Sequence, residues 1–497
     1  MIKTFASFGY EGSMIDVSVE LRDGEPSVDI VGFSDSGVGE LKERLKAVFR
    51  NQHLDFPSER VLIALSPADI RKEGAGYELP IALAILAAQN KLDIKEDIFC
   101  MGELQLSGNT MGLMTGTYAA LQNAVGDGIK YAIMPNGTET VMPDGITVLS
   151  AKNLCEAYQK LVRFAGTSAN AGEIAFSPIL DEEATLDVLK EEQFKGIEWL
   201  KYAMMLAAAG RHNIIAVGAP GCGRSAALVH MGEITPDLTA NELPSTMRIH
   251  SLAGLLHWSD GGMKKRPFRT PHQTASIEGI CGGGVNCRPG EISLAHNGML
   301  FLDEASEFKS SVLQMLRVPL ENGNITLSRA GRNTTYPANF QLLMTSNPCP
   351  CGNYGSKDKI CLCSAKSIDQ YWRKFSSPLL DRVDIRVDMN NPGVIGWFTV
   401  EQMRRLVGKA VKTQFARQGK FNSQLSPSEI EQYIKLDDES RRLLDHNTAQ
   451  YGFSPRAVTS ILKVARTYSD IFGEDSVSKS AIQTAIDFHK PINDYTN

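Results

Sequence analysis

The chain lacks most features that mark membrane, secreted or disulfide-rich proteins. Its 497 residues contain no uninterrupted apolar stretch long enough to span a bilayer, and residues 1–5 do not begin a signal-peptide pattern. Nine cysteines are too few and too scattered for a disulfide scaffold. We therefore expect a cytoplasmic protein with no membrane partner.

An excess of positive charge and internal repetition are also missing. The net charge of −6 argues against a protein that coats nucleic acid with its whole surface, although it does not exclude a local basic patch. No internal repeat or long low-complexity tract is present. The apolar content of 43% is ordinary for a globular protein, and the length provides material for roughly three domains.

A glycine-rich turn follows the apolar run 214–217 and precedes a helix-compatible segment. The turn consists of Gly218, Ala219, Pro220, Gly221, Cys222, Gly223, Arg224 and Ser225. Glycines let successive backbone N–H groups point at phosphate oxygens, next to the positive end of the following helix. The pattern predicts an ATP-binding loop, with Ser225 holding Mg²⁺. A strand-to-helix turn without a ligand is the alternative, and Cys222 occupies a variable position of the pattern.

One residue departs from the phosphate-loop pattern, because Arg224 stands where lysine is expected. Arginine keeps the positive charge but spreads it over a rigid planar fork. A displacement of the reacting group by about 1 Å can lower a rate about a hundredfold. ATP binding is therefore expected, whereas efficient hydrolysis is open to doubt.

Two later apolar runs deliver polar residues to the carboxyl ends of predicted parallel strands. The run 299–302 ends at Asp303 and Glu304, and a second run leads to Asn347. Ligands gather at this edge of a parallel sheet, so we expect Asp303 to hold Mg²⁺ together with Ser225. Glu304 is expected to orient or deprotonate the attacking water, and Asn347 to sense the γ-phosphate. A solvated turn and a loop asparagine bonded to its own backbone are the alternatives.

The first part of the chain, residues 1–161, alternates strand-like and helical patterns and predicts an α+β unit. The stretch 66–80 resembles the Lon-type peptidase fold, also called ribosomal S5 domain 2-like, in which a similar turn presents a nucleophilic serine to a lysine. This chain has Gly76 and Tyr77 near that turn, and alanine at residues 119–120 where the lysine is expected. A serine nucleophile needs an adjacent base. We therefore predict a Lon-like domain without the catalytic dyad.

Three long strings resemble the magnesium-chelatase-like AAA+ proteins of the YifB/ComM family: residues 290–304, 347–352 and 377–384. This family joins a Lon-like domain to an AAA+ module, its members resemble ring-forming ATPases, and its ComM branch is associated with DNA branch migration. The resemblance implies that Arg382 is an arginine finger and that Arg456 is the sensor 2 arginine of the lid. A surface ion pair with a neighbouring aspartate is the alternative for Arg382.

The resulting fold class is α/β, with a P-loop AAA+ module that has a parallel sheet and a C-terminal helical lid. We expect the Lon-like α+β domain at 1–161, a linker at 162–186 and the AAA+ core at 187–390. The core carries a four-cysteine insertion at 349–363, and the helical lid spans 391–497.

Four of the nine cysteines lie close together in sequence. Cys349 pairs with Cys351 and Cys361 with Cys363, across a short polar loop. Four thiolates suit a tetrahedral structural Zn²⁺, which would tie down the loop after Asn347. The CxC spacing is tighter than the usual CxxC, so free thiols and a disulfide stay alternatives to zinc.

A basic stretch at 263–272 is interleaved with one aromatic residue. Such a loop can line the pore of a ring and follow a phosphate backbone, and Arg329 and Arg332 predict a second hairpin that faces the pore. A solvated surface is the alternative for a basic run. His272 is interpreted as a hydrogen-bonding loop residue rather than a metal ligand.

These patterns together predict a ring-forming ATPase, taken as a hexamer, that uses ATP and Mg²⁺ to move on DNA in the manner of a helicase or branch-migration motor. One alternative is a nucleotide-binding assembly module with weak hydrolysis. A second is an ATPase subunit of magnesium-chelatase type.

Overall fold

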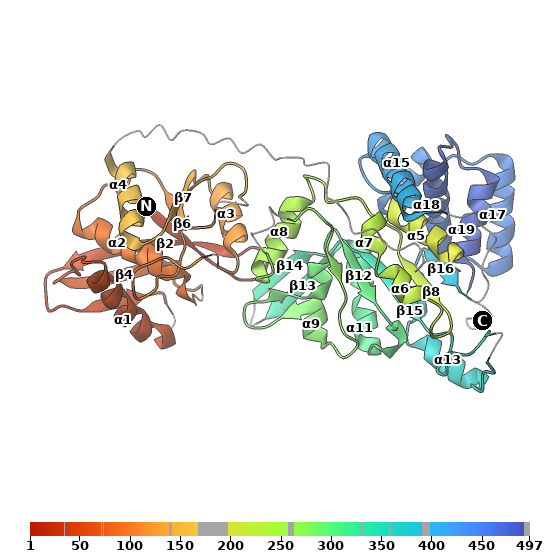
Figure 1. Ribbon diagram of the computed structural model, residues 1–497, viewed down its shortest axis with the longest axis horizontal. Helices are drawn as coiled ribbons and strands as arrows, with labels where there is room; N and C mark the ends of the chain where they lie inside the picture. The colour runs from red at the N-terminus through yellow and green to blue at the C-terminus, as the bar shows by residue number, and fades with distance from the viewer. Residues whose placement is uncertain are drawn as a thin grey trace.

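The computed structural model describes the chain except for residues 34, 71, 73, 113, 139–141, 167–196, 257–262, 330–331, 357–358, 390–397 and 492–497. Figure 1 shows three parts in chain order: an N-terminal region at one end, a central region around a parallel sheet, and C-terminal helices at the other end. Most of the expected linker at 162–186 and the expected boundary near 390 lie outside the described residues.

The N-terminal region is built on a seven-stranded mixed sheet with the order β3-β4-β2-β1-β5-β6-β7. Its strands are β1 (Ile2–Ala6), β2 (Ser13–Arg22), β3 (Val28–Val31), β4 (Arg60–Ser66), β5 (Ile98–Cys100), β6 (Tyr131–Pro135) and β7 (Thr147–Ala151). Its helices are α1 (Asp35–Asn51), α2 (Glu78–Gln89), α3 (Thr117–Gly126) and α4 (Leu154–Gly166). The α+β character expected for this region is confirmed, and α4 continues past the expected boundary at 161.

The central region contains a five-stranded sheet with the order β16-β8-β15-β12-β9, in which all pairings are parallel. Its strands are β8 (Ile214–Val217), β9 (Phe268–Arg269), β12 (Met299–Leu302), β15 (Gln341–Ser346) and β16 (Ile385–Asp388). Every residue of β8, β12 and β15 is buried, as expected for apolar strands covered on both faces. The order places the carboxyl ends of β8, β15 and β12 side by side, where the predicted site residues follow.

Helices surround this sheet (Figure 1), and two separate two-stranded antiparallel pairs belong to the same region. The helices are α5 (Glu198–Gly210), α6 (Arg224–Leu228), α7 (Met231–Ile234), α8 (Leu243–Leu252), α9 (Ile277–Cys281), α10 (Glu291–Leu294), α11 (Ser310–Met315), α12 (Arg317–Asn322), α13 (Ala365–Arg373) and α14 (Ser377–Leu380). One hairpin pairs β10 (Gly282–Gly283) with β11 (Arg288–Pro289). The other pairs β13 (Asn324–Arg329) with β14 (Arg332–Pro337), where a second hairpin was expected.

The C-terminal region is helical, as predicted, and shares a core with α5 and the central sheet. It comprises α15 (Val400–Gln418), α16 (Pro427–Tyr433), α17 (Asp438–Tyr451), α18 (Pro455–Phe472) and α19 (Lys479–His489). Each helix begins behind a side chain that accepts a backbone N–H of its first turn, namely Thr399, Ser426, Asp437, Ser454 and Ser478. Helices α15 and α18 contact α5, and α19 contacts β16.

A buried arginine of α8 joins the N-terminal region to the central one. Arg248 donates hydrogen bonds to the backbone carbonyls of Tyr10, Glu11 and Ala119, and its guanidinium lies 4.9 Å from the centre of the Tyr10 ring. The same guanidinium donates to the side chain of Asn123 at 2.6 Å. Only 7% of Arg248 is exposed, so these groups replace its water.

Among the described residues, no helix combines the length and the apolar composition that a bilayer crossing requires.

Candidate functional site

The glycine-rich turn leaves β8 at Val217 and enters α6 at Arg224. Gly221 and Gly223 have φ values of +85° and +86°, a left-handed conformation that favours glycine. A Cβ on Gly218 would lie 2.6 Å from the Cβ of Met389, so the first position also excludes a side chain. These glycines are thus needed for the shape of the turn, and its role as a phosphate-binding loop stays a prediction.

Arg224 is 5% exposed and bonds in two directions. One guanidinium nitrogen donates to the carbonyl of Gly218, and the other donates to Oδ1 of Asn347 at 2.5 Å. The planar fork therefore spans the turn and the end of β15. Sequence patterns placed Arg224 and Asn347 in one site, but they gave no sign that these two side chains bond to each other.

The two oxygen donors expected to share Mg²⁺ lie together. Ser225 Oγ donates to Asp303 Oδ1 at 2.6 Å, and Thr345 Oγ1 donates to the same oxygen at 2.6 Å. Hydroxyl and carboxylate oxygens are ligands that Mg²⁺ favours. The sequence predicts only a strand at Thr345, and the register of β12 and β15 brings its hydroxyl to Asp303.

Glu304 adopts a left-handed conformation with φ of +49°, which is unusual for a residue other than glycine. Its backbone N–H donates to Thr345 Oγ1 at 2.9 Å, and its carboxylate accepts a hydrogen bond from Gln273 Nε2 at 2.9 Å. Strained backbone of this kind concentrates at functional sites. The carboxylate is thus held at the sheet edge by Gln273, a residue that the sequence did not single out.

The two arginines implied by the family resemblance meet at one glutamate, away from the phosphate loop. Arg382 donates to the Glu321 carboxylate, and Arg456 Nη1 lies 3.6 Å from Glu321 Oε1. The hydrogen bond from Arg382 lowers the pKa of Glu321. All three line a cavity of about 710 Å³. Its described lining includes no residue of the phosphate loop, and the surface partner of Arg382 is Glu321 rather than a neighbouring aspartate.

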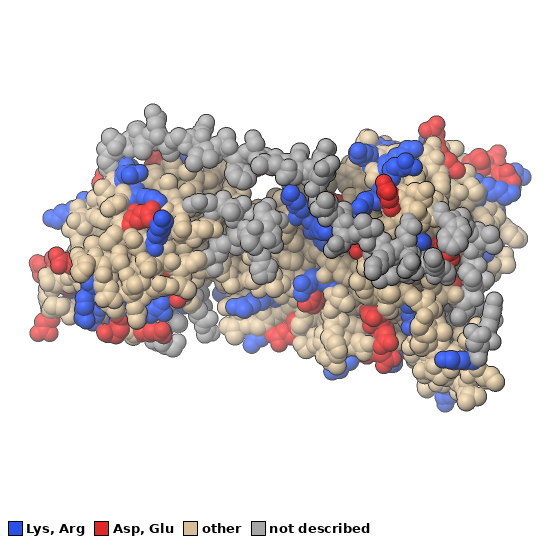
Figure 2. Space-filling model, viewed as in Figure 1, with Lys and Arg blue, Asp and Glu red and all other residues tan. Residues whose placement is uncertain are grey.

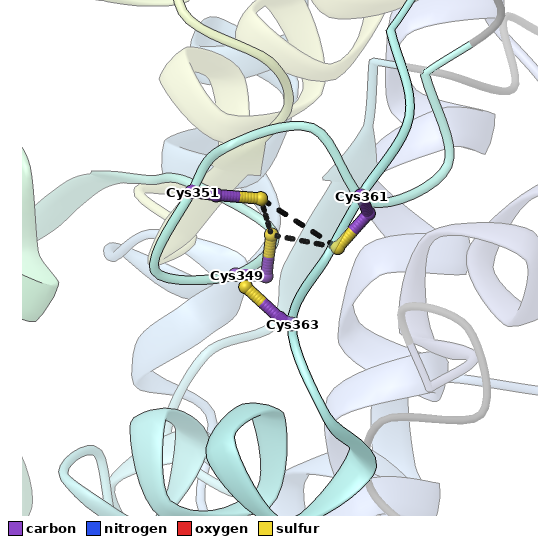
Figure 3. Close-up of side chains that lie close together, drawn as sticks. All are labelled: Cys349, Cys351, Cys361 and Cys363. Carbon is purple, nitrogen blue, oxygen red and sulfur yellow. Dashed lines mark hydrogen bonds between the residues drawn. The ribbon is translucent and has the colours of Figure 1, made fainter.

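The four clustered cysteines converge on one point (Figure 3). The Cys349 sulfur lies 3.4 Å from that of Cys351 and 3.7 Å from that of Cys361, and the last two sulfurs are 3.6 Å apart. The Cys363 sulfur completes the cluster, and all four sulfurs lie within 4.8 Å of one another. Ligands of a tetrahedral zinc with Zn–S bonds of about 2.3 Å are about 3.8 Å apart, so the sulfurs fit this metal. The backbone N–H of Asn353 is the main reason that the pKa of Cys351 is lowered, to about 6.

The basic stretch at 263–272 is divided between interior and surface. Arg266 is 8% exposed and donates to the Glu242 carboxylate at 2.8 Å, while Arg269 makes two hydrogen bonds to Glu291. These two arginines are therefore paired with carboxylates of the chain itself, which leaves the lysines of the stretch for a pore surface. Lys264 and Lys265 are exposed. His272 bonds to Thr274 Oγ1 at 2.8 Å, as expected for a loop residue.

Three other arginines stand on the two hairpins. Arg288 is exposed on β11, and Arg329 and Arg332 stand on β13 and β14. Burial raises the pKa of the Cys287 thiol, and the nearby positive charges of Arg329 and Arg332 offset part of this rise. Arg332 also covers the Phe8 ring at 3.7 Å.

A second basic surface lies on α15, which the sequence analysis did not single out. Arg405, Lys409 and Lys412 are exposed at helical spacing. On the face shown in Figure 2, Lys and Arg side chains gather over this helix, whereas acidic and basic groups are mixed elsewhere. The net negative charge thus coexists with local basic patches.

The turn at which the Lon-type resemblance leads us to look for a nucleophilic serine has Gly76 and Tyr77 instead. Gly76 and Tyr77 are buried, and Ala119 and Ala120 are fully buried in α3. The nearby Lys72 donates to the carbonyl of Ile70 at 2.9 Å, and burial lowers its pKa. The Lon-like fold of this region and the absence of its catalytic dyad both stay predictions.

Three family models match the chain in sequence. They are described as magnesium chelatase, subunit ChlI, at residues 191–394, as subunit ChlI of Mg-chelatase at 17–138, and as magnesium chelatase, subunit ChlI C-terminal, at 399–489. Together they cover the N-terminal region, the central sheet and the C-terminal helices.

Full-length relatives extend over nearly the whole chain. The uncharacterized protein YifB of Escherichia coli K12 is 34% identical, over 98% of this chain and 96% of its own. The competence protein ComM of Haemophilus influenzae is 33% identical, over 97% of this chain and 96% of its own. The DNA replication licensing factor mcm6 of Dictyostelium discoideum is 27% identical over 33% of this chain and 18% of its own.

Proposed function

Since the chain belongs to the YifB/ComM family of magnesium-chelatase-like AAA+ ATPases, we propose that it assembles as a ring and couples ATP hydrolysis to movement on DNA. The sharpest support is the placement of Arg382 and Arg456, which share Glu321 in a cavity without phosphate-loop residues. We infer that a second copy of the chain completes the nucleotide site.

The phosphate-loop half binds ATP and Mg²⁺. Backbone N–H groups of the turn receive the phosphates, and Ser225 and Asp303 hold Mg²⁺, which neutralises charge that develops on the phosphate oxygens. Glu304 orients and deprotonates the attacking water, with its own carboxylate positioned by Gln273. Asn347 stands at the end of the neighbouring strand and contacts the γ-phosphate.

The arginine half acts on a nucleotide bound by a second copy of the chain. A fixed guanidinium stabilises the charge that develops on the transferring phosphoryl group. Arg382 and Arg456 open into one cavity, so both would reach the same neighbouring nucleotide. Repetition of this head-to-tail contact produces a closed ring, for which we propose six subunits.

The DNA partner is supported by the hairpin arginines and by the relatives. Arg288, Arg329 and Arg332 stand on two hairpins that follow the basic stretch, where they can contact backbone phosphates. The names of ComM and mcm6 refer to competence and to DNA replication. A helicase or branch-migration motor is the activity that combines these features with a ring ATPase.

Arg224 favours one alternative function, a nucleotide-gated assembly module with weak hydrolysis. Its guanidinium already bonds to Gly218 and Asn347, so ATP must displace or share these contacts. An ATPase subunit of magnesium-chelatase type would share the core. The relatives that match along almost the full length, YifB and ComM, favour the motor over that subunit.

We also propose a structural Zn²⁺ on Cys349, Cys351, Cys361 and Cys363, on the strength of their sulfur geometry. Elemental analysis of protein purified without added metal tests it. About one zinc per chain is expected, and a stoichiometry near zero in folded protein contradicts the site.

ATP hydrolysis measured with and without branched and single-stranded DNA tests the motor. We expect DNA to stimulate turnover, with the Glu304→Gln variant as the background control for contaminating ATPases. Tight ATP binding with negligible turnover under all conditions would favour the assembly module instead.

A further inference from the structure

One turn of the chain carries both a nucleotide-site residue and two of the clustered cysteines. Asn347 begins the turn and accepts a hydrogen bond from Arg224 at 2.5 Å. Cys349 and Cys351 follow, and Gly352 ends the turn with its N–H donating to the Cys349 carbonyl at 2.9 Å. The cysteine cluster is therefore separated from the nucleotide site by only a few backbone atoms.

The far end of this turn presses against the phosphate loop. A Cβ placed on Gly352 would lie 2.7 Å from Cδ of Pro220 and 2.9 Å from its Cγ. Real Cβ atoms do not approach other heavy atoms this closely, so the Gly352 backbone packs directly on Pro220. The turn thus touches the loop at two points, through Asn347 to Arg224 and through Gly352 to Pro220.

Apolar packing holds the inner part of the turn more firmly than the outer part. Cys349 is fully buried, and Trp372 Nε1 donates to the Pro348 carbonyl at 3.1 Å. The described residues from 351 to 363 form no helix or strand; Tyr354, Cys361 and Cys363 are partly buried against the central core, whereas Ile360 and Leu362 are 84% and 89% exposed. A metal ion shared by the inner and outer cysteines would add a constraint that this partial packing does not supply.

We propose that a metal ion bound by the four cysteines holds Gly352 against Pro220 and Asn347 against Arg224, and thereby sets the nucleotide affinity of the phosphate loop. The inference rests on the zinc site and the ATP site proposed above. Zn²⁺ joins the outer cysteines, Cys361 and Cys363, to the inner turn and fixes its end. Loss of the metal frees the turn, so Gly352 withdraws from Pro220 and the hydrogen bond to Arg224 weakens.

Two ways of disturbing the turn test the coupling in the full-length protein. The first removes the metal, by the Cys361→Ser, Cys363→Ser double variant. The second keeps all four cysteines and changes the contact alone, by Gly352→Ala. Binding of a fluorescent, non-hydrolysable ATP analogue with Mg²⁺ is measured for each, together with zinc content and far-ultraviolet circular dichroism.

Gly419→Ala is the matched control. Gly352 and Gly419 have φ values of +75° and +71°, so alanine imposes similar backbone strain at both. No atom lies within 4 Å of a Cβ placed on Gly419, whereas Pro220 lies in the way at Gly352. We expect Gly352→Ala to retain zinc and bind the analogue about tenfold more weakly, because the added Cβ displaces Pro220 and with it roughly one hydrogen bond from the phosphate loop to a phosphate oxygen. Gly419→Ala should bind it as the native protein does.

The outcomes separate this inference from the proposals beneath it. Native protein without zinc would contradict the metal site, and native protein that does not bind the analogue would contradict the ATP site. If zinc and nucleotide both bind, and neither the metal-free double variant nor Gly352→Ala changes the affinity, the coupling is overturned. A loss of affinity in both variants, with Gly419→Ala unchanged, supports it.

Discussion

The phosphate loop and the arginine cavity hold their cationic groups in opposite ways. Arg224 is buried and bonded to groups of its own site, Gly218 and Asn347. Arg382 and Arg456, whose side chains are 9% and 42% exposed, instead share Glu321, which is 53% exposed, at the edge of a separate cavity. This difference supports the proposal that the first region binds a nucleotide of its own chain and the second acts on a nucleotide bound by a neighbour.

Replacing Arg382 tests the second half of this comparison with the largest expected effect. Arg382→Ala should lower ATP hydrolysis about a thousandfold, since an arginine finger contributes at least that much. Affinity for nucleotide should change little, because the residue lies apart from the loop of its own chain. Steady-state hydrolysis and analogue binding measure the two effects. Equal losses of binding and turnover would place Arg382 in its own subunit's site.

Glu304→Gln tests the phosphate-loop side of the comparison. Loss of a general base should lower hydrolysis about a hundredfold or more, with ATP binding retained. Mixing this variant with Arg382→Ala sharpens the comparison, because each chain then supplies the half that the other lacks. Partial recovery of hydrolysis in the mixture is expected. No recovery, with mixed rings verified by crosslinking, would contradict a site shared between chains.

Arg224→Lys tests the phosphate loop, and we expect it to change ATP hydrolysis less than the two variants above. Lysine lacks the planar fork that reaches Asn347, so the asparagine is released to position the attacking water. We expect hydrolysis to rise about tenfold, the scale of a sub-ångström correction in position, while ATP affinity changes less. A native protein that already turns over briskly, and a lysine variant no faster, would show that the loop is adapted to arginine.

Glu321→Gln should have the smallest effect. The Glu321 side chain is 53% exposed, so solvent screens both of its ion pairs to about 1 kcal/mol each, and freeing both arginines should raise hydrolysis by no more than a fewfold. Hydrolysis at several protein concentrations measures it. A large fall, comparable to that of Arg382→Ala, would mean that Glu321 positions the arginines for catalysis rather than restraining them.

Sequence patterns predicted the parts of the site that depend on local structure. Glycine positions and apolar runs were enough to place the loop after β8 and Asp303 after β12, and parallel strands then had to bring Ser225 and Asp303 together. The cysteine spacing likewise predicted a cluster that the structure assembles. The glycine turn, the carboxylate after its strand and the cysteine cluster each depend on residues that are close together in the sequence.

Contacts between distant segments could not be predicted in this way. Glu321 meets Arg382 and Arg456 because α12, α14 and α18 pack around one cavity, and no local pattern specifies that arrangement. Arg266 belonged to a run that resembled a solvated or nucleic-acid-binding surface. Its burial depends on Glu242, a carboxylate placed by the start of α8 that neutralises the guanidinium.

The hydrogen bonds of Arg248 have a mechanical consequence. Its guanidinium belongs to α8 of the central region, but its acceptors at Tyr10, Glu11 and Asn123 belong to the N-terminal region. Pulling the two regions apart would break all of these hydrogen bonds together, and each contributes about 1.5–3 kcal/mol for a charged donor even after water replaces the acceptor. The junction therefore works as a stiff coupling rather than a hinge, so a displacement of α8 is transmitted to the turn between β1 and β2.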